Sequence, residues 1–173
     1  MDKRKIKGEK PTNKVSIRLR PITKNDKEWI ARVVKKWWGS TDIVTRGQLI
    51  GVTTLPGFLA TRKKTLVGLV TYRILGNECE IVTLNSLMNR KGIGARLVNK
   101  VKKVAVSSKC KRLFVITTND NMDALRFYQK HGFSLVAVHR NALEQSRCLK
   151  KDIPLIGQNG IPLRDEIELE MLL

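Results

Sequence analysis

Apolar and polar positions repeat with two different periods along this chain of 173 residues, and the periods predict its strands and helices. Strict alternation marks residues 15–20 and 166–172 as half-buried strands. Further strands are predicted where short runs are rich in apolar and β-branched residues, at 58–61, 65–73, 78–86, 113–117 and 135–138. A turn at 62–64 joins the runs 58–61 and 65–73, which therefore form a hairpin. A turn at 76–77 precedes the run 78–86.

Apolar residues spaced three and four apart predict the helices. The first helix ends near Gly39 and has one apolar stripe, formed by Trp29, Ile30, Val33, Val34 and Trp37. A second helix starts at Ile93, and a third covers 122–131, with Gly132 as its C-terminal cap. Residues 141–149 are a candidate short helix, whereas 40–57 have no regular period. Strand, helix and strand from 78 to 117 imply a right-handed parallel crossover.

A turn with two glycines joins the strand at 78–86 to the helix that starts at Ile93. Its sequence is Asn89-Arg90-Lys91-Gly92-Ile93-Gly94. Glycine lets backbone amides approach a ligand closely, and the start of a helix presents unpaired N–H groups with partial positive charge. Such a turn is suited to a phosphate or a pyrophosphate. An ordinary tight turn, in which glycine only permits positive φ, is the alternative.

A second block lies about thirty residues further on, and its anchor residues are Asn121, Ala124, Tyr128, Gly132 and Phe133. Together the two blocks resemble the GNAT superfamily of acyl-CoA-dependent N-acetyltransferases. The family's phosphate turn reads Gln/Arg-x-x-Gly-x-Gly/Ala, and its next helix reads Asn-x-x-Ala-x-x-x-Tyr-x-x-x-Gly-Phe. The second pattern is complete here, while the first has Asn89 where Gln or Arg is usual. The resemblance covers residues 15–140.

The resemblance implies the α/β fold of this superfamily. We expect a mixed, mostly antiparallel sheet of about six or seven strands flanked by helices, with a parallel crossover between strands 4 and 5. Residues 15–173 would form one domain, and the Lys-rich residues 1–14 a disordered basic leader. Many members have a second helix on the acceptor side, and residues 42–51 would be a poor version of it.

Acetyl-CoA is the implied donor. Backbone amides of 90–95 would hold its pyrophosphate, and the charges of Arg90 and Lys91 either contact phosphates or are solvated. The pantetheine arm would pair with the end of the strand at 84–86, and Asn121 would bind its amide. The expected coenzyme-binding residues are Leu84, Asn85, Ser86, Asn89, Arg90, Lys91, Gly92, Ile93, Gly94, Ala95, Asn121 and Tyr128.

Two residues are candidates for the proton transfers of the reaction. The resemblance points to Tyr128 as the general acid that protonates the departing thiolate, and a phenol stays protonated at neutral pH. A packing role beside Phe127 and Phe133 is the alternative. Glu80 is the candidate base, and strand alternation places it on the same face as Glu78, where sharing a site would raise one pKa. Exposure of both carboxylates, with ordered water as the base, is the other interpretation.

The acceptor is the least specified part of the reaction. Glu78, Trp38 and Glu168 are the candidate substrate-binding residues. Carboxylates cluster near the C-terminus, where the family's last strand borders the acceptor pocket, at Asp165, Glu166, Glu168 and Glu170. They either hold a cationic amine or form the solvated face of an edge strand. We expect transfer to the primary amine of a small molecule.

Net charge raises an alternative partner. Thirty-four basic and fifteen acidic residues give a net charge of +19 and a pI of about 10.3, which attracts polyanions. Aromatic residues make up only 5% and are not interleaved with the charges, so nucleic-acid binding is not favoured. Two other functions stay open: acetylation of a nucleic-acid-associated protein, and a non-catalytic acyl-CoA-binding or nucleic-acid-binding module.

Cysteine usage and apolar runs restrict the class further. The cysteines are Cys79, Cys110 and Cys148, an odd number without Cys-x-x-Cys spacing, so we expect neither a disulfide framework nor a metal site. No apolar run approaches the roughly 20 residues of a membrane span, and no signal-peptide core is present. We therefore expect a cytoplasmic protein without a membrane partner, and a homodimer stays open.

Overall fold

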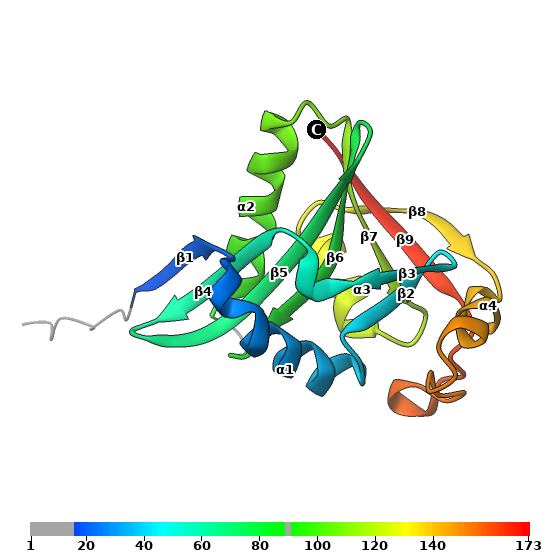
Figure 1. The fold of residues 1–173 in the computed structure, drawn as a ribbon. Coiled ribbons are helices and arrows are strands. Elements are labelled where there is room, and N and C mark those ends of the chain that lie inside the picture. The colour runs from blue at the N-terminus through cyan, green and yellow to red at the C-terminus, as the bar shows by residue number, and fades with distance from the viewer. Residues whose placement is uncertain (1–15, 89–90) are drawn as a thin grey trace, which may run out of the picture.

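The computed structural model describes residues 16–88 and 91–173 (Figure 1). Its main sheet has seven strands in the order β1-β4-β5-β6-β7-β9-β8, and β2 and β3 form a separate hairpin. The strands are β1 (Ile17–Pro21), β2 (Asp42–Thr45), β3 (Gln48–Gly51), β4 (Gly57–Arg62), β5 (Thr65–Leu75), β6 (Glu78–Ser86), β7 (Arg112–Thr118), β8 (Ser134–His139) and β9 (Glu166–Leu172). The helices are α1 (Lys27–Trp38), α2 (Ile93–Ser107), α3 (Met122–Lys130) and α4 (Ala142–Leu149), with 3-10 turns at Lys24–Asp26, Val52–Thr54 and Gln158–Gly160.

Every neighbouring pair in the sheet is antiparallel except β6 and β7, which α2 connects. The predicted mixed sheet and its parallel crossover are therefore confirmed. The alternative that the last strand is an edge strand with a solvated row of carboxylates is wrong. β9 lies between β7 and β8 and is not an edge strand, so its carboxylates do not form a solvated edge.

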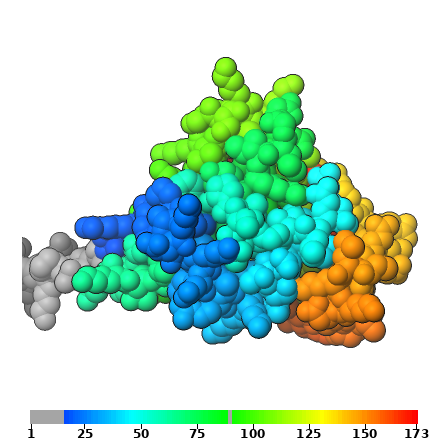
Figure 2. Space-filling model, in the orientation of Figure 1, coloured from blue at the N-terminus to red at the C-terminus, as the bar shows by residue number. Residues whose placement is uncertain are grey.

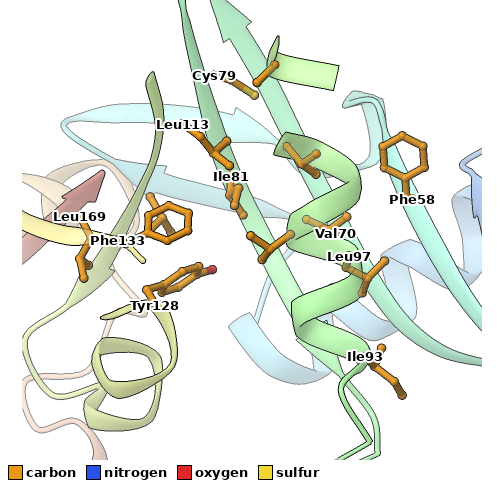
Figure 3. Close-up of a cluster of buried hydrophobic side chains, with 14 of the residues drawn as sticks. Phe58, Val70, Cys79, Ile81, Ile93, Leu97, Leu113, Tyr128, Phe133 and Leu169 are labelled. Carbon is orange, nitrogen blue, oxygen red and sulfur yellow. The ribbon is translucent and has the colours of Figure 1, made fainter. Parts of the chain in front are cut away.

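The two faces of the sheet carry separate apolar cores. On one face, α2 buries its stripe of Ile93, Leu97, Val98, Val101 and Ala105 against β5, β6 and β7 (Figure 3). On the other face, Ile30, Val33 and Val34 of α1 pack over β4, β5 and β6. Each fully buried aliphatic side chain contributes about 1.5–3 kcal/mol relative to exposure, so the two helices are fixed firmly to opposite faces.

Residues 42–51 form the hairpin of β2 and β3, so the poor helix suggested for this segment is wrong. Side chains at 43, 45 and 50 are buried with the period of a strand. Arg46 and Gly47 both have positive φ, 49° and 69°, which is the backbone of a type I′ hairpin turn. Figure 2 shows this hairpin, in cyan, between the blue α1 and the orange segment near residue 150.

The sheet splits between β6 and β7. Their ladder joins only residues 78–81 of β6 to residues 112–115 of β7, and the rest of each strand continues without this pairing. A register shift between Thr71 and Tyr72 of β5 leaves Val82 of β6 as an extra residue, a β-bulge that bends β6 at the end of the ladder. The two strand ends therefore open toward the side where α2 and α3 begin.

Candidate active site

A cleft of about 1100 Å³ occupies the split between β6 and β7. The start of α2 and one side of α3 line one half of it. The C-terminal end of α1, β2 and the segment 150–163 line the other half. The cleft is thus lined by elements from both faces of the sheet.

The start of α2 presents backbone donors to the cleft. Gly92 is the N-cap residue, with φ 67°, and the first helical hydrogen bond runs from Arg96 N to Gly92 O at 3.1 Å. The N–H groups of residues 93–95 precede that bond, and the first turn contains no acidic side chain. Lys91 is exposed on the cleft wall, whereas the predicted residues Asn89 and Arg90 lie outside the described residues.

Gly94 holds α2 close to α3. A Cβ atom at this position would lie 3.1 Å from Cζ of Phe127, closer than ordinary van der Waals contact. A Cβ atom there would require the Phe127 ring to shift, so glycine favours the close approach of the two helices, and this approach sets the amides of α2 beside α3. This accounts for the second glycine of the turn by packing, and for the first by its positive φ.

Asn121 caps α3 and also lines the cleft. Its Oδ1 accepts a hydrogen bond from Ala124 N at 3.1 Å, which satisfies one of the unpaired donors of the first turn. The cap uses the oxygen of the amide group, so Nδ2 is left as a donor toward a ligand. This is the arrangement that the predicted contact with a pantetheine carbonyl requires.

Tyr128 packs against its aromatic neighbours and also lines the cleft. The ring packs edge-on against Phe127 and Phe133, at centroid distances of 5.2 Å and 5.1 Å, and only 5% of the residue is exposed. It nevertheless lines the cleft, and Figure 3 shows its hydroxyl directed away from α3 toward β6 and α2. Burial raises the pKa of Tyr128, so the phenol remains protonated at neutral pH.

The end of β6 forms the floor of the cleft, with Leu84, Asn85 and Ser86 all on its lining. Leu84 belongs to the core on the α2 face. Asn85 pairs in register with Leu69, a member of the core under α1, and its side chain is therefore on the α1 face. Asn85 is 6% exposed, and its Oδ1 has no hydrogen-bond partner within the described part of the chain.

Glu80 and Glu78 do not line the cleft. Glu80 is 1% exposed, and its Oε2 accepts a hydrogen bond from Nε of Arg73 at 2.6 Å. Burial raises the pKa of Glu80, and Arg73 opposes that shift. Glu78 instead pairs with Arg112 at 2.8 Å, so the two carboxylates have separate cationic partners. The assignment of Glu80 as a base stays a prediction that its position does not favour.

Glu168 also lies outside the cleft lining, in a buried ion-pair group under the β2–β3 hairpin. Its carboxylate pairs with Arg112 at 2.7 Å and with His139 at 2.9 Å. Burial acts to raise the pKa of Glu168, but the hydrogen bonds from His139 and Arg112 outweigh it and hold that pKa below its usual value. Glu166 accepts a hydrogen bond from Arg46 N of the hairpin, and burial raises its pKa.

The half of the cleft lined by the end of α1, β2 and the segment 150–163, called the acceptor half below, contains residues that the sequence analysis did not single out. Trp38 lines it as predicted, and so does Trp37, which was expected in the core but is 56% exposed. Asp120, at the end of β7, and the segment 150–163 were missed. The run Thr117-Thr118-Asn119-Asp120 after a strand was the available signal, but a strand end rich in polar residues is common.

Residues 16–88 and 91–173 contain no group of three or more His, Cys, Asp or Glu side chains placed to hold a metal ion. None of their helices is both long and apolar enough to cross a membrane.

Known proteins are similar to this chain in sequence and in fold. The uncharacterized protein YdhI of Bacillus subtilis (strain 168) is 41% identical over 133 residues, which are 76% of this chain and 83% of YdhI. An IAA acetyltransferase from Bacillus cereus ATCC 14579 has a similar structure, with a TM-score of 0.71, 23% identity, and coverage of 91% of this chain and 100% of that one. A GNAT family acetyltransferase from Elizabethkingia anophelis with acetyl-CoA bound gives a TM-score of 0.66 at 24% identity, covering 91% and 98%.

The family itself is established by sequence. The model of the acetyltransferase (GNAT) family matches residues 24–133, from the turn before α1 to the end of α3. That span contains both blocks that carry the resemblance and the strands between which the cleft opens. The chain belongs to the GNAT family of acetyltransferases.

Proposed function

We propose that this protein transfers the acetyl group of acetyl-CoA to the primary amine of a small molecule. The observation that carries the proposal is the meeting of three groups in one cleft: the free amides at the start of α2, the end of β6, and the hydroxyl-bearing ring of Tyr128. The related structure from Elizabethkingia anophelis, which has acetyl-CoA bound, supports the choice of donor.

Different residues of the cleft would bind different parts of acetyl-CoA. The amides of 93–95, with the positive end of the α2 dipole, would hold the pyrophosphate, and Lys91 would add a charge. Asn121 would donate to the pantetheine arm, which would lie along the end of β6. The thioester would then be placed in the split between β6 and β7, with Tyr128 on the α3 side.

The chemistry is a direct transfer. The amine lone pair attacks the thioester carbonyl carbon, the carbon–sulfur bond breaks, and the thiolate takes a proton from the Tyr128 hydroxyl. An amine that arrives as ammonium first gives one proton to solvent, which frees the lone pair, and the nitrogen loses a second proton after the attack. The phenolate regains one proton from solvent, so the products are an amide and a thiol. General acid catalysis of this kind contributes about 10²- to 10⁴-fold.

The test compares the protein with its Tyr128→Phe variant in a thiol-release assay with acetyl-CoA and a panel of amines. Phenylalanine keeps the contacts with Phe127 and Phe133, so we expect folding and acetyl-CoA affinity to be unchanged and kcat to fall about 100-fold or more. Tyr72→Phe is the matched control, because Tyr72 is the other tyrosine and does not line the cleft. Equal rates for Tyr128→Phe and the unmodified protein would refute the role of the hydroxyl.

A further inference from the structure

The acceptor half of the cleft contains a buried carboxylate that has no cationic partner among the described residues. Asp120 is 4% exposed and lines the cleft. Oδ2 accepts a hydrogen bond from Gln158 N at 2.7 Å, and Oδ1 accepts one from the Thr118 hydroxyl. In 16–88 and 91–173, no Lys, Arg or His side chain forms a salt bridge with it. A buried carboxylate normally has a positive partner, so this one is left to be neutralised by a ligand.

The carboxylate has lone pairs to spare for that ligand. An ionised carboxylate offers about four acceptor sites, and the two hydrogen bonds to Asp120 use two of them. Across the split, Asn85 presents a buried Oδ1 that has no partner among the described residues. Asp120 has acceptor sites left over, Asn85 Oδ1 has no donor among the described residues, and an ammonium group carries donors only. The polar groups of this half of the cleft are therefore complementary to a protonated amine.

Apolar side chains form most of the remaining wall, beside the polar Lys150, Asp152 and Gln158. Trp37 and Trp38 come from the end of α1, Ile43 from β2, Leu143 from α4, and Ile153 and Ile156 from the segment 150–163. Such a wall favours an apolar body and offers few partners to the polar backbone of a peptide. Exposed indole faces also attract a cation, so the tryptophans suit the same ligand.

Hydrogen bonds hold this wall in place around the carboxylate. Lys150 donates from Nζ to the backbone oxygens of Trp38 at 2.9 Å and Asp42 at 3.3 Å, which joins α4 to the end of α1 and to β2. Asn119 donates to Pro162 O at 2.9 Å, so the segment 150–163 is tied to the end of β7. The segment thereby bounds the acceptor half and limits the size of what enters.

We propose that the acceptor is a small cationic amine with an apolar body, such as an arylalkyl or alkyl monoamine, and that Asp120 binds its ammonium group. This inference rests on the proposed acetyl transfer and adds the chemical class of the acceptor. It excludes protein lysines, peptide N-termini and polyamines as preferred acceptors. The apolar wall and its bounding segment carry that exclusion.

The first test needs no variant. Binding of 2-phenylethylamine and of 2-phenylethanol to the full chain is measured by calorimetry in the presence of CoA, since the two differ only in the group that reaches Asp120. We expect the amine to bind at least about tenfold more tightly. In the thiol-release assay, kcat/KM for 2-phenylethylamine or hexylamine should exceed that for spermidine and for a peptide with a free N-terminus. Equal binding of amine and alcohol, or preference for the peptide or spermidine, would overturn the inference.

The second test is Asp120→Asn, which keeps an acceptor for Gln158 N. We expect KM for the amine to rise about 30-fold or more, with acetyl-CoA affinity unchanged. Glu144→Gln is the matched control: Glu144 is exposed on α4 and does not line the cleft, so its loss should change KM less than about threefold. An unchanged KM in Asp120→Asn overturns the inference alone. Failure of the unmodified protein to bind acetyl-CoA, or to release thiol with any amine, overturns the proposed function and the inference together.

Discussion

Removal of the Glu80 carboxylate separates a structural role from the role of a base. Glu80 is 1% exposed, and Arg73, whose side chain is 17% exposed, holds it through a 2.6 Å hydrogen bond. In Glu80→Ala, the guanidinium loses its charged partner and the core gains a cavity. Breaking a buried ion pair on one side costs about 3–5 kcal/mol. We therefore expect a loss near the lower end of that range, because part of Arg73 still reaches solvent.

Glu80→Gln is the sharper variant, because it preserves volume and one acceptor oxygen for Arg73. The hydrogen bond becomes neutral on one side, so we expect a smaller loss, about 1–2 kcal/mol in the free energy of unfolding. For a chain of this size that loss lowers Tm by about 2–8 °C. Urea unfolding at pH 7 gives the free energy, and the thiol-release assay gives kcat.

The two roles predict opposite patterns. If Glu80 only supports the sheet, Glu80→Gln loses stability but keeps kcat within about threefold, since the side chain is outside the cleft. If Glu80 is the base, kcat falls about 10²- to 10⁴-fold. We expect the first pattern. Glu78→Gln is the control for removal of one charge from the same strand, at a side chain that is 37% exposed. Normal stability with a 100-fold loss of kcat in Glu80→Gln would refute our interpretation.

Two further predictions concern the donor site and the N-terminal turn. Gly92→Asp should abolish acetyl-CoA binding without unfolding the protein. Open space surrounds a Cβ there, the positive φ costs a side chain about 1–2 kcal/mol, and the carboxylate would oppose an anion at the start of α2; calorimetry showing unchanged affinity would contradict this. Hydrogen bonds from Arg20, chiefly, and from Thr23 hold the pKa of Asp26 far below its ordinary value of 3.8. Asp26 therefore stabilises the fold above about pH 4, and that contribution is lost as the pH falls. The difference in unfolding free energy between the unmodified protein and Asp26→Asn, about 1–2 kcal/mol at pH 6, should shrink toward pH 3 in urea titrations, and a constant difference would argue against the ion pair.

The donor half of the cleft was predictable because its determinants are local in sequence. Two glycines between an apolar strand and an apolar helix define the start of α2, and the spacing from Asn121 to Tyr128 defines one side of α3. Local periodicity and the turn residues therefore predict where both helices begin. They predict only an unspecified anion as the ligand, and the resemblance to the family identifies that ligand as acetyl-CoA.

The acceptor half was not predictable, because it depends on contacts between distant segments. Residues 42–51 have only four-residue strands, and the turn at Arg46-Gly47 lacks the usual Asn-Gly or Asp-Gly signal. The hydrogen bond from Gln158 N to the Asp120 carboxylate joins residues 38 apart in the chain. No periodic pattern encodes such a contact, and the same holds for the tie between Lys150 and the end of α1.

The acidic residues of β9 show how a local pattern and distant contacts differ in what they determine. Their alternation predicted one solvated face, but β8 pairs along the open side of β9, and the hairpin covers the face instead. Glu166 binds Arg46 N at the hairpin turn, and Arg73 donates both to Glu80 and to Gln48 of β3. Ile43 on β2 lines the cleft, so the charges fix the hairpin that supplies part of the acceptor wall. Charged residues outside the cleft lining therefore help to fix one wall of the cleft.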